Sequence, residues 1–414
     1  MADVQTLTVN LYDDPVGTLT LLPGDRSIFA FSDGYLEDST RPTLSLSFKD
    51  EFGEILSETR PTQTRLTPFF SNLLPEGHMR DYLASRAGVK SVREFHLLWA
   101  LGSDLPGAMT VTSADGSAWP MEEEDLGNPR ENDVKRESAM RFSLAGVQMK
   151  FSAIDEAKGG LTIPVDGAGG AWIIKLPSSR FNRVPENELS MMTLADQVGM
   201  DIPPHRLVDA ADISGLPDGV EFLDEPSFAV ERFDRTTEGE ALQIEDFAQV
   251  FGVYPADKYK KATYRSIANV LWIETGSAGI EEFIRRLVFN TLIGNADMHL
   301  KNWSLIYRDR RTATLAPGYD FVSTITYLDD EYAALKFVKT KKMIDLSSDE
   351  LSRLAAKASV PETLVLDTAQ TTVERFIDVW NEQKSHLLLT KDATETIDKH
   401  YQRIALTREV IGKR

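Results

Sequence analysis

The stretch NADMHLKNWSL, residues 295–305, is a strongly polar end to an apolar segment. The run directly before it, FIRRLVFNTLIG, has the apolar content of a buried helix. Burying polar and charged groups is unfavourable unless they are paired or bind something. We therefore interpret the stretch as a functional loop that a rigid helix supports. Within six residues it carries two charges, an imidazole and an amide, from Asp297, His299, Lys301 and Asn302.

The spacing of these groups matches the parts that phosphoryl transfer requires. A kinase uses one carboxylate to position and deprotonate the acceptor hydroxyl, and an amide and a second carboxylate to hold magnesium. Asn302 follows Asp297 by five residues, as in the catalytic loop of protein kinases. Asp320, eighteen residues further on in YDFV, stands where the Asp of D-F-G is expected. Val322 replaces the glycine of D-F-G, which puts a switch of that type in doubt but not metal ligation by Asp320.

Two residues upstream complete the predicted set. Lys175 ends the apolar strand AWIIKLP, as the lysine of V-A-I-K does. Glu188 lies thirteen residues later, in the first turn of the next predicted helix, where it can pair with Lys175. Each feature alone has an ordinary structural explanation, such as a strand end or a dipole partner at a helix start. All of them together, in kinase order and on suitable elements, favour a phosphotransferase.

The composition narrows the functional classes. With 414 residues, 42% of them apolar and 26% charged, the chain is expected to form two or three globular domains. Its net charge of −19 argues against DNA binding over a whole face, although YKKATYR (259–265) and KTKK (339–342) remain local basic patches. The absence of cysteine excludes disulfides, cysteine zinc sites and thiol nucleophiles. No Walker A sequence is present, which excludes a P-loop NTPase.

The chain is expected to be cytoplasmic and to have no membrane partner. Its start, MADVQTLTVN, lacks the basic and apolar regions of a secretion signal. No run approaches the 18 apolar residues of a membrane span.

The order of predicted elements indicates two lobes preceded by a further subdomain. Alternating strands are expected in TLTVNLY, GTLTL, SIFAFS and TLSLSF, followed by helices and a closing strand. A second strand-rich region surrounds AWIIKLP, and after about residue 240 the chain is mostly helical apart from a hairpin after the catalytic loop. This α+β layout is that of a protein-kinase-like fold. The predicted domains are an N-terminal subdomain (1–113), an acidic linker (114–140), a nucleotide-binding small lobe (141–238) and a helical catalytic lobe (239–414).

Several stretches taken together resemble the HipA family of bacterial toxin serine/threonine kinases. They are FSLAGVQMK, IIKLP, NELSMM, AVERFDR, NADMHLKN and PGYDFVS, with RPTLSLSF, FFSNLLPEG and LLWALGSDLPGAMTV in the N-terminal part. The resemblance implies a two-lobed kinase-like fold with a β-rich N-terminal subdomain packed on the small lobe. It also implies ATP- and Mg²⁺-dependent phosphorylation of a serine, in known cases on an aminoacyl-tRNA synthetase, which causes growth arrest and persistence. The implied partners are a HipB-like helix-turn-helix antitoxin and, mainly through it, operator DNA.

The resemblance also assigns roles to individual residues. Asp297 matches the catalytic base, and Asn302 and Asp320 match the magnesium ligands. Ser143 matches a serine whose autophosphorylation inactivates the kinase. A phosphate there would add about −2 charge beside the phosphates of ATP. The implied ATP-binding residues are Ala145, Gly146, Val147, Gln148, Met149, Lys150, Lys175, Glu231, Arg232, Phe233, His299, Leu300, Lys301, Asn302, Tyr319 and Asp320.

Two other functions are compatible with the same residues. One is a kinase-like ATP-binding corepressor scaffold that acts with a DNA-binding antitoxin, and the other is a small-molecule kinase with the same order of Asp, Asn and Asp. His299 has no second nearby histidine that would support zinc. Lys301 is expected either to neutralise transferred phosphate or to be solvated. The acceptor substrate is not identified by the residues.

Overall fold

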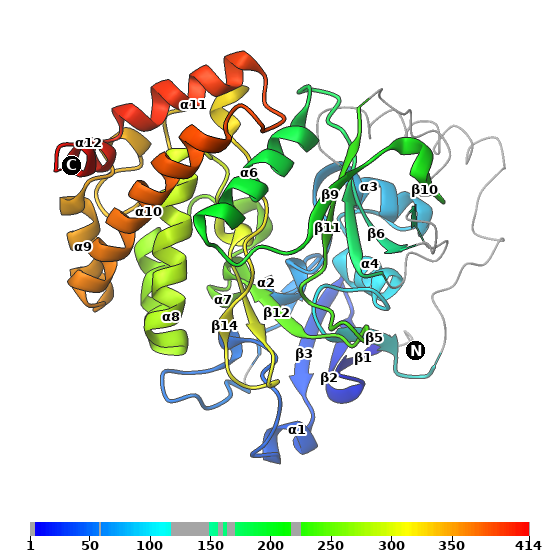
Figure 1. The fold of residues 1–414 in the computed structure, drawn as a ribbon. Helices are drawn as coiled ribbons and strands as arrows, with labels where there is room; N and C mark the ends of the chain where they lie inside the picture. The colour runs from blue at the N-terminus through cyan, green and yellow to red at the C-terminus, as the bar shows by residue number, and fades with distance from the viewer. Residues whose placement is uncertain are drawn as a thin grey trace.

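A computed structural model describes residues 5–57, 59–116, 149–155, 160–163, 170–216 and 225–413 (Figure 1). The predicted phosphorylation site Ser143 and the phosphate-loop residues Ala145, Gly146, Val147 and Gln148 lie outside these residues. Within them, two strand-rich regions precede a region in which helices dominate.

The N-terminal subdomain, residues 5–57 and 59–116, is built on a five-stranded antiparallel sheet in the order β4-β3-β2-β1-β5. In β1, Leu7, Val9 and Leu11 are buried and alternate with partly exposed residues, as the period of two in the sequence predicts. Their side chains form one core with residues of the helices that cover the sheet. The elements are β1 (Thr6–Leu11), β2 (Asp14–Leu22), β3 (Arg26–Phe31), α1 (Asp33–Glu37), β4 (Thr62–Gln63), α2 (Pro68–Ser71), α3 (Gly77–Arg86), α4 (Glu94–Leu101) and β5 (Met109–Ser113).

The prediction of a strand in TLSLSF is wrong. The stretch instead runs into a 3-10 helix, η1 (Leu46–Phe48). The Ser45 hydroxyl donates to Glu245 Oε2 (2.5 Å), and the Leu46 N–H donates to Glu245 Oε1 (2.9 Å). These bonds to a completely buried carboxyl group hold the backbone in a bend, so a tertiary contact overrides the local alternation of polar and apolar residues.

The small lobe contains a six-stranded sheet in the order β10-β7-β6-β8-β11-β9. Helix α6 contacts β9 and β11. The sequence places Glu188 in the first turn of this helix, but the helix begins at Val184, so Glu188 is in the second turn. Pro185 is accommodated in the first turn, where its missing N–H costs no helical hydrogen bond. The elements are β6 (Lys150–Asp155), β7 (Leu161–Thr162), β8 (Trp172–Lys175), α6 (Val184–Val198), β9 (His205–Val208), β10 (Ile213–Ser214) and β11 (Ser227–Glu231).

The helical lobe begins with a strand that pairs with the predicted hairpin. The hairpin is confirmed as β13 and β14, and β12 extends it to three strands. Helix α8 is interrupted at Gly276, which has a left-handed backbone (φ 64°). Among the described residues, no helix is both long enough and apolar enough to cross a bilayer. The elements are β12 (Gln243–Asp246), α7 (Phe247–Val250), α8 (Tyr264–Leu292), β13 (Ser304–Tyr307), β14 (Thr314–Leu315), α9 (Ser348–Ala358), α10 (Glu362–Gln383), α11 (Lys391–Arg403) and α12 (Ala405–Ile411).

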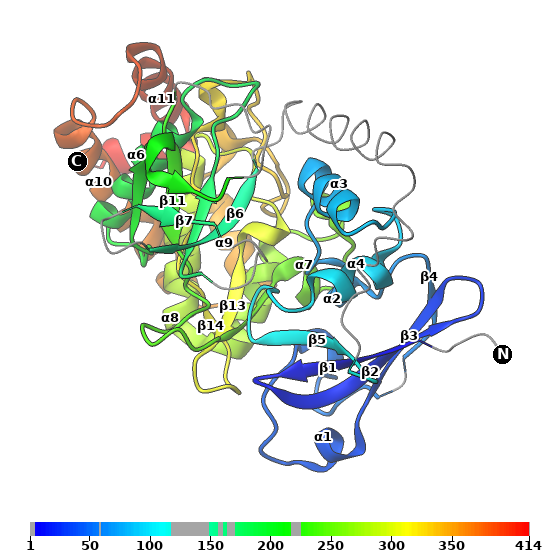
Figure 2. The same ribbon diagram turned by 90° about the vertical axis from the view of Figure 1, so that its right-hand side faces the viewer.

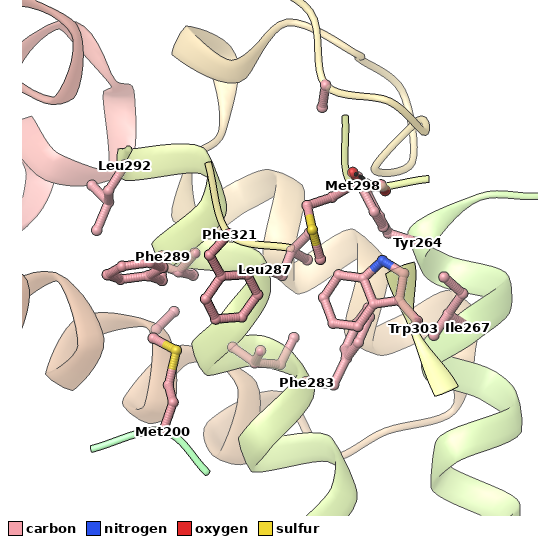
Figure 3. Close-up of a cluster of buried hydrophobic side chains, with 14 of the residues drawn as sticks. Met200, Tyr264, Ile267, Phe283, Leu287, Phe289, Leu292, Met298, Trp303 and Phe321 are labelled. Carbon is pink, nitrogen blue, oxygen red and sulfur yellow. Dashed lines mark hydrogen bonds between the residues drawn. The ribbon is translucent and has the colours of Figure 1, made fainter. Parts of the chain in front are cut away.

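An aromatic core anchors the chain on both sides of the predicted catalytic loop (Figure 3). The Trp303 ring lies 4.9 Å from that of Phe283 in α8, and Phe321 lies 5.7 Å from Phe289 in the same helix. Met298 is also almost completely buried. Burying each of these side chains stabilises the fold by about 1.5–3 kcal/mol. The polar residues between them are therefore held on a rigid base.

The N-terminal subdomain contacts both lobes (Figure 2). Tyr82 of α3 belongs to the buried cluster of the small lobe, which confirms the expected packing on that lobe. The subdomain also reaches the helical lobe, where Asn72 Nδ2 donates to the Val253 carbonyl (2.8 Å) and Gln249 Nε2 donates to the Phe69 carbonyl (3.2 Å). The subdomain thus braces the junction of the two lobes.

Candidate active site

Asn295 connects the end of α8 to the two predicted catalytic segments. It is almost completely buried, and its Nδ2 donates to Asn290 Oδ1 (2.8 Å) and to the Asp320 carbonyl (3.3 Å). Its Oδ1 accepts from the Asp297 N–H (3.0 Å). One amide therefore sets the backbone positions of both carboxylates. Sequence reasoning did not assign it a role, although it is the first residue of the quoted stretch.

Asp297 presents a carboxylate with one oxygen already oriented. The Tyr259 hydroxyl donates to its Oδ1 at 2.6 Å. The side chain opens to solvent on one side, but the protein around it partly desolvates the carboxylate and raises its pKa, against the effects of Tyr259 and Lys258. With Oδ1 engaged, Oδ2 is the oxygen on which an acceptor hydroxyl can place its proton.

Asn302 is held against the backbone of Asp297. Its Nδ2 donates to the Asp297 carbonyl at 2.9 Å, and the side chain is buried. This bond settles the orientation of the amide and leaves Oδ1 as its outward acceptor. The structure thus brings together the two residues that the sequence spacing paired.

Lys175 lies between the carboxylates of Glu188 and Asp320. The sequence predicted its pairing with Glu188. Its Nζ forms ion pairs with Glu188 of α6 and with Asp320. The side chains of Lys175 and Glu188 are 5% and 1% exposed, so the pair is shielded from water. Burial opposes the ammonium charge, but Asp320 and Glu188 outweigh it and raise the pKa of Lys175. Lys175 is therefore a permanently charged group at the base of the site.

Asp320 of the helical lobe forms ion pairs with lysines of the small lobe. Besides Lys175 it contacts Lys150 of β6, whose Nζ lies 3.5 Å from Oδ2. Burial opposes ionisation, but Lys150 and Lys175 hold the pKa of Asp320 well below its usual range. Its backbone has φ of +57°, a left-handed conformation that is strained for a residue with a side chain and is frequent at functional sites.

The donor set fits a hard divalent cation that is shared with a ligand. Asp320 and Asn302 offer the oxygen atoms that Mg²⁺ prefers. In the described part of the chain, no group of three or more His, Cys, Asp or Glu residues forms a complete metal cage. Magnesium is usually held by one or two carboxylates with substrate phosphates and water. The site therefore matches a cation that arrives with a nucleotide.

His299 is a buried, neutral imidazole next to these carboxylates. Burial, with Lys258, lowers its pKa to about 3 despite Asp320. Its ring lies edge-on to Tyr259 with the centroids 4.9 Å apart. Within the described residues its Nδ1 has no hydrogen-bond partner. An unpaired buried nitrogen costs about 1–3 kcal/mol, which points to a ligand contact here.

Lys301 takes a position that neither sequence expectation foresaw. Its ammonium pairs with Glu76 of the N-terminal subdomain (2.9 Å) and donates to the Asn72 carbonyl (3.0 Å). Glu76 also pairs with Lys258 (2.9 Å). Although partial burial acts in the opposite direction, the two lysines lower the pKa of Glu76 to about 2. One carboxylate of the N-terminal subdomain thus connects Lys301 of the predicted catalytic loop with Lys258 of a segment that packs against it.

Two backbone N–H groups of the predicted hinge are already hydrogen-bonded within the protein. The Glu231 N–H donates to the Pro204 carbonyl (2.8 Å), and the Arg232 N–H donates to the Ala171 carbonyl (2.7 Å). A nucleotide base would therefore pair with other backbone groups of this segment. The guanidinium of Arg232 is buried and pairs with Asp234 (2.9 Å) and with Asp104 of the N-terminal subdomain (3.1 Å).

The remaining predicted residues line the same region. The Tyr319 hydroxyl donates to the Lys301 carbonyl (2.9 Å), and its ring lies 5.4 Å from that of Phe233. Leu300 and Met149 are buried. The structure therefore joins Lys150, Lys175, Glu188 and Asp320 directly, and Asp297 with Asn302. Sequence reasoning assigned no role to Tyr259, Lys258 and Glu76. Tyr259 begins the basic stretch YKKATYR, Lys258 directly precedes it, and Glu76 lies in FFSNLLPEG, but nothing in the sequence links these two stretches.

Comparisons with known proteins cover nearly the whole chain. The family described as HipA N-terminal domain matches residues 7–112, and the HipA-like C-terminal domain matches residues 142–380. The candidate kinase Y4dM of Sinorhizobium fredii is 57% identical over 413 residues, which are 99% of each chain. The serine/threonine-protein kinase toxin HipA of Shewanella oneidensis is 26% identical over 378 residues, covering 80% of this chain and 78% of that protein.

A solved structure shows the same fold. A chain in the complex of Shewanella oneidensis HipA, HipB and operator DNA superposes with a TM-score of 0.73 at 22% identity, covering 98% of this chain and 99% of that chain. The two-lobed kinase-like architecture is thus confirmed for the described residues. Both domain matches, the similarity to Y4dM and this fold lead to one conclusion: the chain belongs to the HipA family of kinases.

Proposed function

We propose that this protein is an ATP- and Mg²⁺-dependent serine/threonine-protein kinase and the toxin of a HipBA-type toxin–antitoxin system. The observation that carries the proposal is the buried ion pair of Lys175 with Glu188, in contact with Asp320. Protein kinases require this Lys–Glu pair and the metal-binding Asp to be in place together for transfer. Asp297 lies beside them on the anchored catalytic loop.

The residues divide the chemistry between them. Asp297 orients the acceptor hydroxyl and takes its proton at Oδ2, while Tyr259 holds Oδ1. Lys175, kept in place by Glu188, neutralises phosphate charge. Asn302 and Asp320 would hold Mg²⁺, which when bound neutralises charge on the phosphates of ATP. Lys150, whose exposed ammonium lies 3.5 Å from Asp320 Oδ2, would leave that oxygen available to the cation.

Regulation by Ser143 is a further part of the proposal. Ser143 precedes Lys150 by seven residues in the sequence, and a phosphate on it would add about −2 charge to this segment. That charge competes with the phosphates of ATP for the same lysines and inactivates the enzyme. Ser143→Ala is expected to remain active for longer after addition of ATP.

We also propose a HipB-like antitoxin as the partner. The support is the solved neighbour, which is a complex of HipA, HipB and operator DNA. The net charge of −19 favours DNA contact mainly through the antitoxin. The protein substrate is expected to be a component of translation such as an aminoacyl-tRNA synthetase, with growth arrest and persistence as the outcome in the cytoplasm.

The experiment is transfer of labelled phosphate from ATP in the presence of Mg²⁺. Wild-type protein should label itself at Ser143 and label proteins of a cell extract, and Asp297→Ala should reduce both by about 10²–10⁴-fold. Equal labelling by the two proteins would refute the assignment of Asp297. Growth arrest by both proteins, without labelling, would favour the corepressor scaffold. Label on a small alcohol with none on protein would favour a small-molecule kinase.

A further inference from the structure

Two segments that are distant in sequence form a basic surface beside the catalytic loop. The first continues from Tyr259 into Lys260 and Lys261, and the second carries Lys336 and Lys339. Thr263 forms a bridge with Lys336, and the Tyr264 N–H donates to the Lys336 carbonyl (3.0 Å). We call the four lysines the basic platform: Lys260, Lys261, Lys336 and Lys339.

The first segment of the basic platform directly follows a residue that contacts Asp297. Tyr259, directly before Lys260, donates to Asp297 at 2.6 Å, and the Leu300 N–H donates to the Lys258 carbonyl (3.4 Å). Since a chain advances at most about 3.6 Å per residue, the four residues from Tyr259 to Thr263 span no more than about 14 Å. This is the length of about four residues of an extended substrate, so Lys260, Lys261 and the bridge to Lys336 lie within reach of residues that flank the phosphorylated one, and Lys339 extends the platform by three residues.

The four ammonium groups are free to bind a partner. All four side chains are exposed, whereas the neighbouring Lys258 and Lys301 are engaged by Glu76. Across the described ranges, none of the ion pairs involves a platform lysine. The chain as a whole carries 64 acidic and 45 basic residues, so a cluster of four lysines without ion pairs is opposite in sign to the net charge of the protein.

The backbone beneath the second segment is held in place. The buried carboxylate of Glu350 accepts from the N–H groups of Val338, Lys339 and Thr340 at 2.9, 2.6 and 3.2 Å. The turn is closed by the Phe337 N–H, which donates to the Thr340 carbonyl (3.0 Å). Preorganised charges of this kind bind a partner at a smaller entropic cost than charges on a free loop.

We propose that the basic platform binds acidic residues of the protein substrate, within about five residues of the phosphorylated serine or threonine. This inference rests on the proposed kinase function and names the class of substrate. A nucleic acid fits less well, because its closely spaced phosphates would also face the acidic surface of a chain with a net charge of −19. Charge patterns of this kind are a common basis of kinase specificity.

The test compares charge-reversal variants of the full-length protein on a dephosphorylated cell extract with ATP and Mg²⁺. The variants are Lys260→Glu with Lys261→Glu, Lys336→Glu with Lys339→Glu, and the control Lys391→Glu with Lys399→Glu in α11, where both side chains are highly exposed. Phosphorylated sites are identified and quantified by mass spectrometry. Labelling of the protein itself reports the intrinsic activity of each variant.

We expect wild-type sites to be rich in Asp and Glu near the acceptor. Each exposed charge pair contributes about twofold to fivefold, and reversal replaces attraction by repulsion. Each platform variant should therefore label these sites at least about tenfold more slowly, while self-labelling and the control stay within about twofold. Raising the salt concentration should reduce the difference, because exposed charges are screened.

Three results would overturn the inference. Wild-type sites without acidic neighbours would refute it, as would unchanged substrate labelling by both platform variants. Loss of wild-type labelling after nuclease treatment, restored by added RNA, would assign the basic platform to nucleic acid instead. A wild type that labels neither itself nor any extract protein refutes the kinase function as well, which separates that failure from the other three.

Discussion

Replacing Glu245 by glutamine tests how the N-terminal subdomain is held on the helical lobe. Glu245 lies in β12 and is completely buried. Its carboxyl group accepts hydrogen bonds from Ser45 Oγ (2.5 Å), the Leu46 N–H (2.9 Å) and the Tyr307 hydroxyl. Burial raises the pKa of Glu245 to about 7, although these hydrogen bonds act in the opposite direction. The stability of the contact between the N-terminal subdomain and the helical lobe should therefore depend on pH below and near neutrality.

The sign follows from where the proton is bound. The unfolded chain releases it near pH 4.5 and the folded protein near 7, so between these values the folded state binds more protons. The contribution of Glu245 to stability is complete below pH 4.5 and is lost as the pH rises to about 7. At about 1.4 kcal/mol for each pH unit between the two pKa values, the loss is about 3 kcal/mol.

Urea unfolding of wild type and Glu245→Gln between pH 4.5 and 7.5 measures this loss. Glutamine carries no titrating proton, and its Oε1 and Nε2 can bond to the same three partners. The wild type should lose about 3 kcal/mol of unfolding free energy relative to the variant across this range. Glu240→Gln, at an exposed position, should follow the wild type. Parallel curves for wild type and Glu245→Gln would refute the reasoning.

Three further substitutions probe the site. Lys175→Met leaves the buried Glu188 without its cation and removes one of the two lysines that contact the partly exposed Asp320. It should destabilise the protein by about 3–5 kcal/mol in urea unfolding, and a loss below about 1 kcal/mol would contradict a buried ion pair. Tyr259→Phe removes the hydroxyl that donates to Asp297 and should lower kcat about tenfold with little change in KM for ATP. A change in KM alone would argue that Tyr259 does not position Asp297. Glu76→Gln removes the ion pairs with Lys258 and Lys301 and should lower the free energy of unfolding by about 1 kcal/mol, because the carboxylate is partly exposed. The difference in unfolding free energy between wild type and variant should shrink in high salt. A difference that does not depend on salt would indicate a packing effect instead.

Much of the fold follows from local patterns in the sequence. The alternation in β1 and β2, the hairpin β13–β14 and the amphipathic helices of the C-terminal part were predictable because each pattern has the period of its own element. The same reasoning failed at TLSLSF, where hydrogen bonds to Glu245 decide the backbone. Helix α6 also begins earlier than predicted, at Val184, because a proline can occupy a first turn.

The site divides in the same way. The pairing of Lys175 with Glu188 could be predicted, because a strand end and the next helix lie close together in the chain. The pairing of Lys301 with Glu76 could not, because 225 residues separate them and no spacing rule connects them. Arg232 likewise matches a hinge position in the sequence, but its side chain points into an ion pair with the N-terminal subdomain.

By itself, the sequence predicted which chemical groups form the candidate site: a carboxylate and an amide on a loop behind a buried helix, and a second carboxylate after the following hairpin. Only the tertiary structure decided how these groups are held. Tyr259 orients Asp297, Asn295 links the two acidic segments, and Glu76 joins the N-terminal subdomain to the catalytic loop. The physical reason is that hydrogen bonds and ion pairs act over a few ångströms, so they depend on which surfaces the packed core brings together and not on separation along the chain.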